Sequence, residues 1–494
     1  MNKKNKKGGI NKNMKIFFLI FSLALIFFSL LFDVFILVVD ILPSKYLLIL
    51  LLGTNFFVAL NVCIMLKRKF KLWFKFIITF FSLIFILLFI IGCIYINKTY
   101  NFMGRIKSNG MITETYYIIT TKDSSYNKIS ELDSKEIGTY NENVEIYDKA
   151  ISELNKKINV NLKEYDSIFE MTDSLLDEEV DVVMISAYHK NSISEVRDDF
   201  DDKIKIIDTI EVKVKKETEE TVNVDVRNET FTVYVSGIDQ YGDISTRSRS
   251  DVNMLVTVNP KNHEVLLTSI PRDYYVRLHN TTGYKDKLTH AGIYGIDMSI
   301  KTIEDFLNVN IDYYVRVNFS TLVDVVDVIG GIDVYSDLTF VPWTDRSFVI
   351  YEGVNHMNGP MALAFARERY SYKEGDRHRV QNQQDVIAAI IKKVTSSSTI
   401  LTKYTKLLDE LSKSFETNID FNSIKPLIKY QIDKMPSWTI KSYSLNGSDA
   451  YDYTYSAGMQ ELYVMIPDES TITKGRDYIN GMESGLSFSE LGIN

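Results

Sequence analysis

Arginines and carboxylates recur after position 238, where predicted strands end or begin. The set comprises Asp239, Arg247, Arg249, Asp251, Arg272, Asp273, Arg367, Arg369, Asp376, Arg377, Arg379 and Gln383. Several arginines stand two positions apart, and in an extended segment that spacing puts both guanidinium groups on one face. A guanidinium donates two parallel hydrogen bonds to a phosphate, and Mg²⁺ binds one or two carboxylates such as Asp239 and Asp251 together with phosphate oxygens. Spacing alone leaves two interpretations open: a pyrophosphate site with Mg²⁺, or a surface network of ion pairs.

Other catalytic patterns are weak in this sequence. The six histidines show no HExxH or other zinc spacing, and His290 is best explained as a structural histidine. Ser236-Gly237 does not form a G-x-S-x-G elbow. Both cysteines, Cys63 and Cys93, lie inside apolar runs, so the chain offers neither a disulfide framework nor a CxxC metal or redox site.

The segment that carries the arginines alternates predicted strands and helices. Strands are predicted at 230–235, 254–258, 264–270, 313–318 and 332–335, and helices at 299–307, 319–329, 358–365 and 383–393. This alternation predicts an α/β fold with a central sheet flanked by helices. We expect the valine-rich helix 319–329 to pack in the core; the alternative is that it also lines an apolar groove.

A smaller unit precedes it. Strands are predicted at 116–120, 135–138, 161–165 and 180–186, with amphipathic helices at 142–157 and 167–177. The β-α-β-α-β order looks like half of a periplasmic-type binding domain. It contains no Gly-rich phosphate loop and no metal-spaced His or Cys cluster, which favours a spacer or interaction domain over a small-ligand site.

The first hundred residues are mostly apolar. Three stretches, 16–39, 46–66 and 76–96, are long enough to cross about 30 Å of hydrocarbon as helices. We expect Asp33, within the first stretch, to face another helix in a polar packing role. Lysines and arginines gather before the first span and between the second and third, so the positive-inside rule places both segments in the cytoplasm and exports everything after Asn97.

The composition and length of the chain limit its class and its number of domains. The chain has 494 residues, 46% of them hydrophobic and 24% charged, with a formal charge of −8. An acidic balance with no basic stripe after position 100 argues against nucleic acid as a partner. The predicted organisation is α/β after the membrane helices: a cytoplasmic tail and three spans (1–96), a linker (97–114), an accessory α/β domain (115–215), a linker (216–228), a larger α/β domain (229–470) and a C-terminal tail (471–494).

The ordered motifs of the larger domain resemble those of the LytR-CpsA-Psr family of cell-wall ligases. They are Arg249-Ser250-Asp251, Ser269-Ile270-Pro271-Arg272-Asp273, Asp286-Lys287-Leu288-Thr289-His290-Ala291-Gly292, Asn318-Phe319 with Gly330-Gly331-Ile332, and Ala364-Phe365-Ala366-Arg367-Glu368-Arg369 with Gly375-Asp376 and Gln383. Three spans followed by an extra domain are similar to the CpsA-type arrangement. Val252-Asn253 departs from a Thr-containing version of the first motif.

The resemblance implies a phosphotransferase on the outer face of the cell membrane. Such an enzyme moves a glycopolymer, a teichoic acid or capsule for example, with one phosphate from a polyprenyl-pyrophosphate carrier to a peptidoglycan hydroxyl. Carried over to this sequence, Asp239 and Asp251 hold Mg²⁺, or Mn²⁺ in its place. The implied pyrophosphate ligands are Arg249, Arg272, Arg367, Arg369 and Arg379, supported by Asp376 and Gln383. The lipid tail is expected in an apolar cavity beneath them.

Three points stay open from the sequence. The general base could be Asp251, Asp376 or a water held by the metal. Water in place of the acceptor hydroxyl would make the protein a pyrophosphatase of the same substrate. A membrane-bound sensor or regulator of wall synthesis is the alternative outside enzymes, although the arginine–aspartate set is complete.

Overall fold

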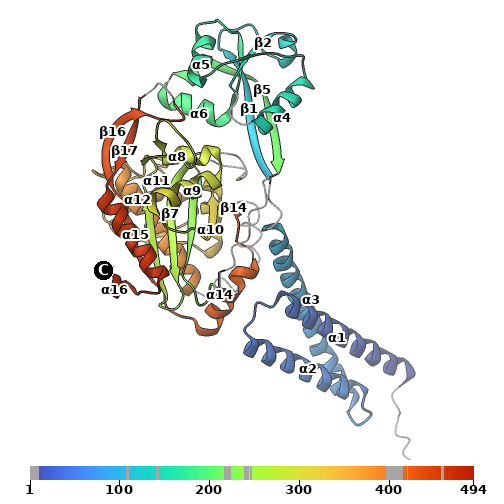
Figure 1. Ribbon diagram of the computed structural model, residues 1–494. Helices are drawn as coiled ribbons and strands as arrows, with labels where there is room; N and C mark the ends of the chain where they lie inside the picture. Colours follow the sequence, from blue (N-terminus) through green and yellow to red (C-terminus); the bar gives the residue numbers. More distant parts are fainter. Residues whose placement is uncertain are drawn as a thin grey trace, which may run out of the picture.

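The computed structural model describes residues 11–106, 111–140, 144–197, 199–215, 224–238, 244, 248–396, 415–419, 421–457 and 461–493. Three parts are visible in Figure 1: a bundle of long helices at the lower right, a small α/β domain at the top and a larger α/β domain at the left.

Three helices form the N-terminal part: α1 (Lys12–Val39), α2 (Ser44–Leu66) and α3 (Leu72–Ile106). Each contains a stretch long and apolar enough to cross a membrane, which indicates membrane anchoring. Asp33 of α1 accepts a hydrogen bond from Asn55 of α2 at 2.8 Å, which agrees with the expected packing role. The third apolar stretch ends at Lys98 and α3 continues to Ile106, so the segment predicted as a linker from residue 97 begins as helix.

The accessory domain holds one five-stranded sheet in the order β3-β2-β4-β1-β5. Its elements are β1 (Met111–Thr121), η1 (Ile129–Leu132), β2 (Glu136–Thr139), α4 (Val144–Asn155), β3 (Asn161–Glu164), α5 (Ile168–Leu176), β4 (Val182–Ser186), α6 (Ala187–Val196), α7 (Phe200–Lys203) and β5 (Ile204–Lys215). β2 is parallel to β3 and β4, whereas β1 is antiparallel to β4 and β5. The unit is therefore α/β with a mixed sheet, and its last strand, β5, was not predicted from the sequence.

The larger domain is built on a six-stranded sheet in the order β14-β11-β6-β7-β8-β15. The strands are β6 (Phe231–Ile238), β7 (Ser250–Asn259), β8 (Glu264–Ile270), β11 (Tyr313–Val317), β14 (Phe415–Thr417) and β15 (Thr439–Ser444). β6, β8, β11 and β15 run in one direction, and β7 and β14 run in the other. Their apolar side chains are buried on both faces, as expected when helices cover both sides of a sheet.

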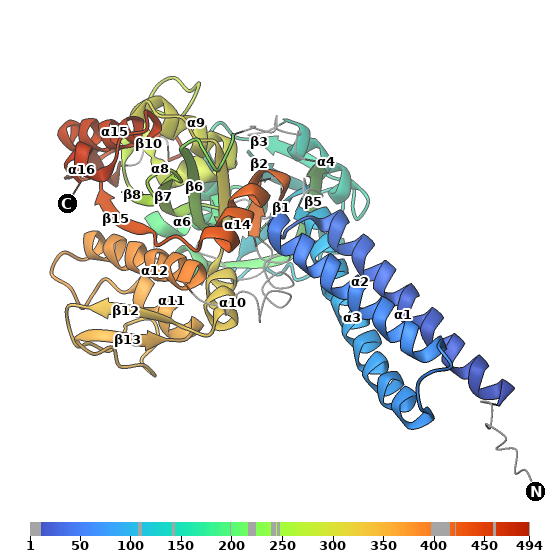
Figure 2. The same cartoon turned by 90° about the horizontal axis from the view of Figure 1, so that it is seen from below.

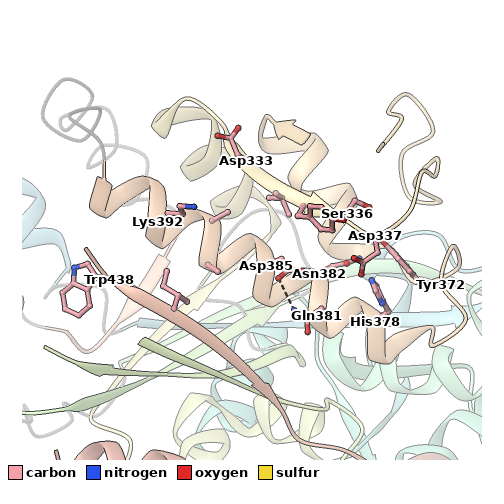
Figure 3. Close-up of a pocket in the computed structure, with 15 residues that line it drawn as sticks. Asp333, Ser336, Asp337, Tyr372, His378, Gln381, Asn382, Asp385, Lys392 and Trp438 are labelled. Atoms are coloured by element: carbon pink, nitrogen blue, oxygen red, sulfur yellow. Dashed lines mark hydrogen bonds between the residues drawn. The ribbon is translucent and has the colours of Figure 1, made fainter. Parts of the chain in front are cut away.

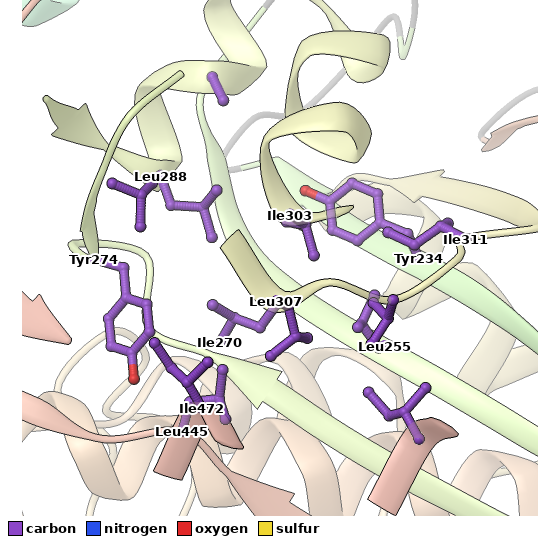
Figure 4. Close-up of a cluster of buried hydrophobic side chains, with 14 of the residues drawn as sticks. Tyr234, Leu255, Ile270, Tyr274, Leu288, Ile303, Leu307, Ile311, Leu445 and Ile472 are labelled. Carbon is purple, nitrogen blue, oxygen red and sulfur yellow. The ribbon is translucent and has the colours of Figure 1, made fainter. Parts of the chain in front are cut away.

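Helices cover both faces of this sheet, as Figure 2 shows. One face carries η2 (Gly292–Tyr294), α8 (Leu288–Ala291), α9 (Ile296–Leu307), α15 (Glu469–Glu483) and α16 (Phe488–Leu491), which bury the cluster drawn in Figure 4. The other face packs against α12 (Asp376–Ser396) and α14 (Phe421–Lys434). Beyond α12 lie α10 (Phe319–Ile329), α11 (Gly359–Arg367) and a hairpin of β12 (Ile332–Ser336) and β13 (Gly353–Met357). Two further strand pairs are β9 (Tyr275–Val276) with β10 (Asp286–Lys287), and β16 (Gly447–Tyr453) with β17 (Glu461–Pro467).

The C-terminal segment corrects one prediction. Residues 471–494 were expected to form a tail outside the domain. Instead, Ile472, Ile479 and Met482 of α15 and Phe488 of α16 are buried in the core beside β7 and α9. The helical spacing of these apolar residues puts them on one side of α15, so the segment completes the domain.

The larger domain also contacts the membrane helices. Asp40, at the end of α1, lies 2.7 Å from Lys429 and 3.5 Å from Lys425 of α14, joining carboxylate oxygen to ammonium nitrogen. Lys45, at the start of α2, lies 2.5 Å from Asp433 of the same helix. The turn between α1 and α2 therefore lies on the same side of the helix bundle as the larger domain.

Candidate functional site

The sheet brings the predicted site residues together at one edge. β6, β8 and β11 end at this edge and the antiparallel β7 begins there, because of the strand directions given above. Arg249 and Asp251 stand at the start of β7, Arg272 follows β8, and Asn318 follows β11. Ligand sites of open α/β sheets lie at such edges, in the crevice beyond the carboxyl ends of parallel strands.

Hydrogen bonds fix the start of β7. The hydroxyl of Tyr234 donates to Oδ1 of Asn253 at 2.6 Å, and the side chain of Asn253 donates to the backbone carbonyl of Ser250 at 2.9 Å. A side chain added at Gly292 would meet the backbone of Ser248 and Ser250 at 2.8 Å, so only glycine lets this loop pack so close. Asn253 therefore has a structural role where a hydroxyl was expected from the motif.

A cavity of about 410 Å³ opens at this edge. Its polar lining includes Arg249, Asp251, Arg272, Arg367, Arg369, Arg379 and Gln383, from the start of β7, the turn after β8, the end of α11 and the first turns of α12. Its apolar lining includes Val235, Val317, Phe319, Leu322, Leu363, Ala366, Val386 and Ile387. One cavity thus combines a cluster of cations with an apolar compartment.

Asp251 is the central carboxylate of the cluster. Its Oδ1 accepts from Nη1 of Arg272 at 3.2 Å and from the hydroxyl of Thr289 at 3.1 Å. Burial alone would raise the pKa of Asp251, but the charges of Arg272, Arg249 and Arg379 outweigh it and hold the pKa below its usual range. Asp251 is therefore ionised at neutral pH.

The cations outnumber the carboxylates that they face. Nη2 of Arg379 lies 2.7 Å from Oδ1 of Asp376, one turn earlier on α12. Its buried Nε has no hydrogen-bond partner among the described residues. Burial lowers the pKa of Arg379, and the charges of Arg272 and Arg369 add to that lowering against the attraction of Asp376. A buried guanidinium in an excess of positive charge is stabilised by an anion, so the cluster fits a polyanionic group.

Aromatic rings position the two arginines after α11. The guanidinium of Arg367 lies 4.2 Å from the ring centroid of Phe319, and that of Arg369 lies 4.7 Å from the ring centroid of Tyr370. These cation–π contacts hold the two long side chains in place at the cavity.

The structure brings together seven of the nine predicted site residues, as the lining shows. Asp376 is not part of the lining but contacts Arg379, and Asp239 lies outside the described residues. Sequence reasoning missed Thr289, Trp343 and Tyr370. Thr289 belongs to a quoted motif, whereas Trp343 lies in a loop without periodicity that gave no signal.

The valine-rich helix serves both suggested purposes. Val326, Val328 and Ile329 of α10 are buried in the core, and Phe319 and Leu322 at its N-terminal end line the cavity. His290 is buried, with its Nδ1 2.7 Å from Oδ1 of Asp286, which agrees with a structural role.

Of the two carboxylates that the sequence predicts as metal ligands, Asp239 and Asp251, the structure describes only Asp251. Within the described residues, no group of three or more His, Cys, Asp or Glu side chains could hold a metal ion. Asp251 supplies an ionised oxygen ligand beside the cationic cluster, and Mg²⁺ characteristically takes one or two carboxylates and completes its shell with water and phosphate oxygens. The donor chemistry of Asp251 therefore fits Mg²⁺.

A second cavity of about 560 Å³ lies against α12 and is drawn in Figure 3. Its charged and titratable lining residues are Asp333, Tyr335, Asp337, Tyr372, His378, Asp385 and Lys392. It contains three carboxylates and no arginine, so it repels phosphate. The first cavity is therefore the candidate site for an anionic substrate.

Known proteins match this domain. A polyisoprenyl-teichoic acid–peptidoglycan teichoic acid transferase, TagU of Bacillus cereus, is 38% identical over 210 residues, which span 42% of this chain and 67% of the relative. TagV of Bacillus subtilis, which carries the same transferase name, is 36% identical over 260 residues, or 51% of this chain and 64% of that protein.

Solved structures match the same region. A crystal structure of TagV from Bacillus subtilis covers 53% of this chain and 99% of its own, with 33% identity and a TM-score of 0.45. A structure of TagT bound to LIIa-WTA covers 55% of this chain and 95% of its own, with 27% identity and a TM-score of 0.44.

The profile of the LytR_cpsA_psr family matches residues 200–471. The match spans more than half of the chain and includes every residue placed at the cationic cavity. The chain belongs to the LytR_cpsA_psr family.

Proposed function

We propose that this protein transfers a glycopolymer of the teichoic acid class, with one phosphate, from a polyprenyl-pyrophosphate carrier to a hydroxyl of peptidoglycan. The observation that carries the proposal is the combination of five arginines and two amide side chains with an apolar compartment in one cavity. A pyrophosphate joined to a long hydrocarbon has these two parts. The names of TagU and TagV support the choice of teichoic acid as the polymer and peptidoglycan as the acceptor.

The reaction balances as a single displacement. The acceptor oxygen forms a bond to the phosphorus that carries the glycan, and the bond from that phosphorus to the bridging oxygen breaks. Polyprenyl phosphate leaves, and the acceptor hydroxyl gives up its proton. Negative charge spreads over the phosphoryl oxygens and the bridging oxygen, so preorganised guanidinium groups supply much of the stabilisation.

The proposed roles of the residues in this reaction follow from where they lie in the cavity. Arg249 and Arg272 stand at the strand edge and Arg379 on the first turn of α12; the charges of all three act on Asp251, so we assign them to hold the pyrophosphate against the sheet. Arg367 and Arg369 close the opposite side from the end of α11. Because the pKa of Asp251 is held low, that carboxylate is a weak general base, and its charge suits a metal ligand better.

Mg²⁺, or Mn²⁺ in its place, belongs to the proposal as the cofactor. Asp251 would hold it, with Asp239 as the second carboxylate implied by the sequence. When bound, the ion would neutralise charge on the two phosphates.

The proposed location is the outer face of the cell membrane, with the N-terminus in the cytoplasm. Basic residues before α1 and between α2 and α3 support this orientation. The contacts of α14 with the turn between α1 and α2 place that turn and the larger domain on one side of the membrane, which agrees with three spans.

The test uses the full chain in detergent with Mg²⁺ and a short-chain polyprenyl-pyrophosphate glycan. We expect polyprenyl phosphate release that depends on added peptidoglycan fragments, with glycan phosphate joined to the fragment. Release into water alone would make the protein a pyrophosphatase. Tight binding without release would favour the sensor interpretation.

A further inference from the structure

Two exposed aromatic residues stand at the mouth of the cationic cavity. Trp343 and Tyr370 both line it, yet their side chains are 59% and 61% exposed. Their ring centroids lie 5.3 Å apart. The guanidinium of Arg346 lies 4.6 Å from the ring centroid of Trp343, and Nη2 of Arg369 donates to the hydroxyl of Tyr370 at 2.5 Å. The two rings therefore form one surface next to an arginine of the proposed pyrophosphate site.

A buried carboxylate fixes the backbone beneath both rings. Glu368 is fully buried; its Oε2 accepts from the backbone N–H of Trp343 at 2.6 Å, and its Oε1 accepts from those of Tyr370 and Ser371 at 2.7 and 2.9 Å. Burying a carboxylate is costly unless its oxygens are hydrogen-bonded. Glu368 thus links the backbone at Trp343 to the segment after α11. These hydrogen bonds, and not burial of the rings, fix the position of Trp343 and Tyr370.

Trp343 and Tyr370 differ in exposure from the cationic and apolar side chains that line the cavity. The five arginines and the apolar residues named above are buried or partly buried, whereas the two rings are exposed. In a lipid-linked glycan the sugar is likewise the part that extends beyond the hydrocarbon and the pyrophosphate. Tyr370 contacts Arg369, so the aromatic pair borders the phosphate end of the cavity.

We propose that Trp343 and Tyr370 form a subsite for the sugar ring attached to the distal phosphate of the donor. This inference rests on the proposed function and extends it to recognition of the saccharide. Rigid aromatic side chains offer large contact surfaces at low conformational cost, and their polar tips tolerate water. Glu368 acts as a positioning residue for both rings.

The test compares two ligands on the full chain in detergent. One is the polyprenyl-pyrophosphate disaccharide donor, and the other is the same lipid pyrophosphate without sugar, used as a competitive inhibitor. Trp343→Ala should raise KM for the donor about fivefold to tenfold, the loss expected for one aromatic contact. The value of kcat and the inhibition constant of the sugarless lipid should both stay within about twofold. Trp343→Phe should recover most of the loss.

The matched control is Tyr351→Ala. Tyr351 is 63% exposed and lines neither of the two cavities described, so its substitution should leave KM unchanged. Equal weakening of the donor and the sugarless lipid by Trp343→Ala would overturn the subsite, because the ring would then contact lipid or pyrophosphate. An unchanged KM would overturn it as well.

Fluorescence provides a readout that does not depend on turnover. Binding of a soluble disaccharide phosphate should change the tryptophan emission of the wild-type chain and should not change that of Trp343→Phe. If the wild-type protein turns over no donor but this signal is present, the proposed function fails while the sugar subsite stands. If the donor is turned over and the signal is absent, the subsite fails alone.

Discussion

The two cavities of the larger domain share a helix but have opposite charge. Arg379 and Gln383 of α12 line the first cavity, whereas His378, Gln381 and Asp385 of the same helix line the second. Successive residues of a helix point about 100° apart, so neighbours in sequence reach different compartments. The helix therefore separates a site that attracts polyanions from one that repels them.

The volume of a cavity does not by itself identify the candidate site. The acidic cavity is the larger of the two, about 560 Å³ against about 410 Å³. Only the smaller one has excess guanidinium charge beside an apolar compartment. Charge and lining, rather than size, identify the site.

Arg272→Ala should give the largest effect that tests this contrast. Arg272 contacts Asp251 and Asp273 at the strand edge, and its loss removes a preorganised cation from the proposed pyrophosphate site. We expect polyprenyl phosphate release to fall by about 10²- to 10³-fold. Lys392→Ala, which removes the lysine of the acidic cavity, should stay within about twofold of wild type. A folded Arg272→Ala protein with full activity would refute the site, and circular dichroism checks the fold.

Two glutamines provide a matched pair with a smaller expected effect. Gln383 lines the cationic cavity, and Gln381 donates to Asp385 at 3.1 Å in the acidic one. Gln383→Ala should lower kcat/KM about tenfold through loss of one hydrogen bond to a charged group. Gln381→Ala should leave it unchanged. An equal loss of kcat/KM for both variants in steady-state kinetics would contradict the assignment of the substrate to the cationic cavity.

The acidic cavity predicts a dependence of stability on pH. Burial raises the pKa of Asp385 to about 6, and the charge of Asp337 adds to this. Because the carboxyl holds its proton more tightly in the folded protein than in the unfolded chain, stability should fall as pH rises from about 4 to about 6 and level off above. Asp385→Asn should remove that fall and raise Tm at pH 7.5 by about 2–4 °C.

Thermal unfolding at several pH values measures this effect. Asp345→Asn is the control, because Asp345 is an exposed aspartate that lines neither cavity. Its pH profile should keep the wild-type slope between about pH 4 and 6. An Asp385→Asn profile with the same slope would show that another carboxyl causes it.

Removal of the accessory domain should have the smallest effect. Both cavities are lined only by residues after 233, so a chain without residues 111–215 keeps each of them complete. Turnover of a short soluble donor analogue should stay within about twofold of the full chain. If turnover is abolished, the spacer interpretation of that domain is wrong.

The strand-edge part of the site was predictable because local patterns define it. Short apolar runs predict the strands β7, β8 and β11, and the polar residues at the ends of these strands follow directly from the sequence. Arg272 and Asp251 needed only the rule that such ends meet at one edge.

Long-range contacts could not be predicted in this way. β14 pairs with β11 and β15 with β8 across about a hundred residues or more, and no local periodicity encodes such a partner. α15 is largely polar outside its buried stripe, so its apolar spacing gave too weak a signal to exclude a tail. Trp343 depends on a hydrogen bond to Glu368, twenty-five residues later in the chain.

The contacts of α14 with Asp40 and Lys45 give the larger domain a second attachment to the membrane helices. The first attachment is the covalent connection through α3, and the two together restrict the rotation of the larger domain relative to the membrane helices. A lipid-linked donor diffuses in two dimensions, so an enzyme held at a constant height samples it at the surface density of the membrane. These ion pairs join partly exposed side chains and are weakened by salt. The strength of this second attachment therefore depends on the ionic strength around the larger domain.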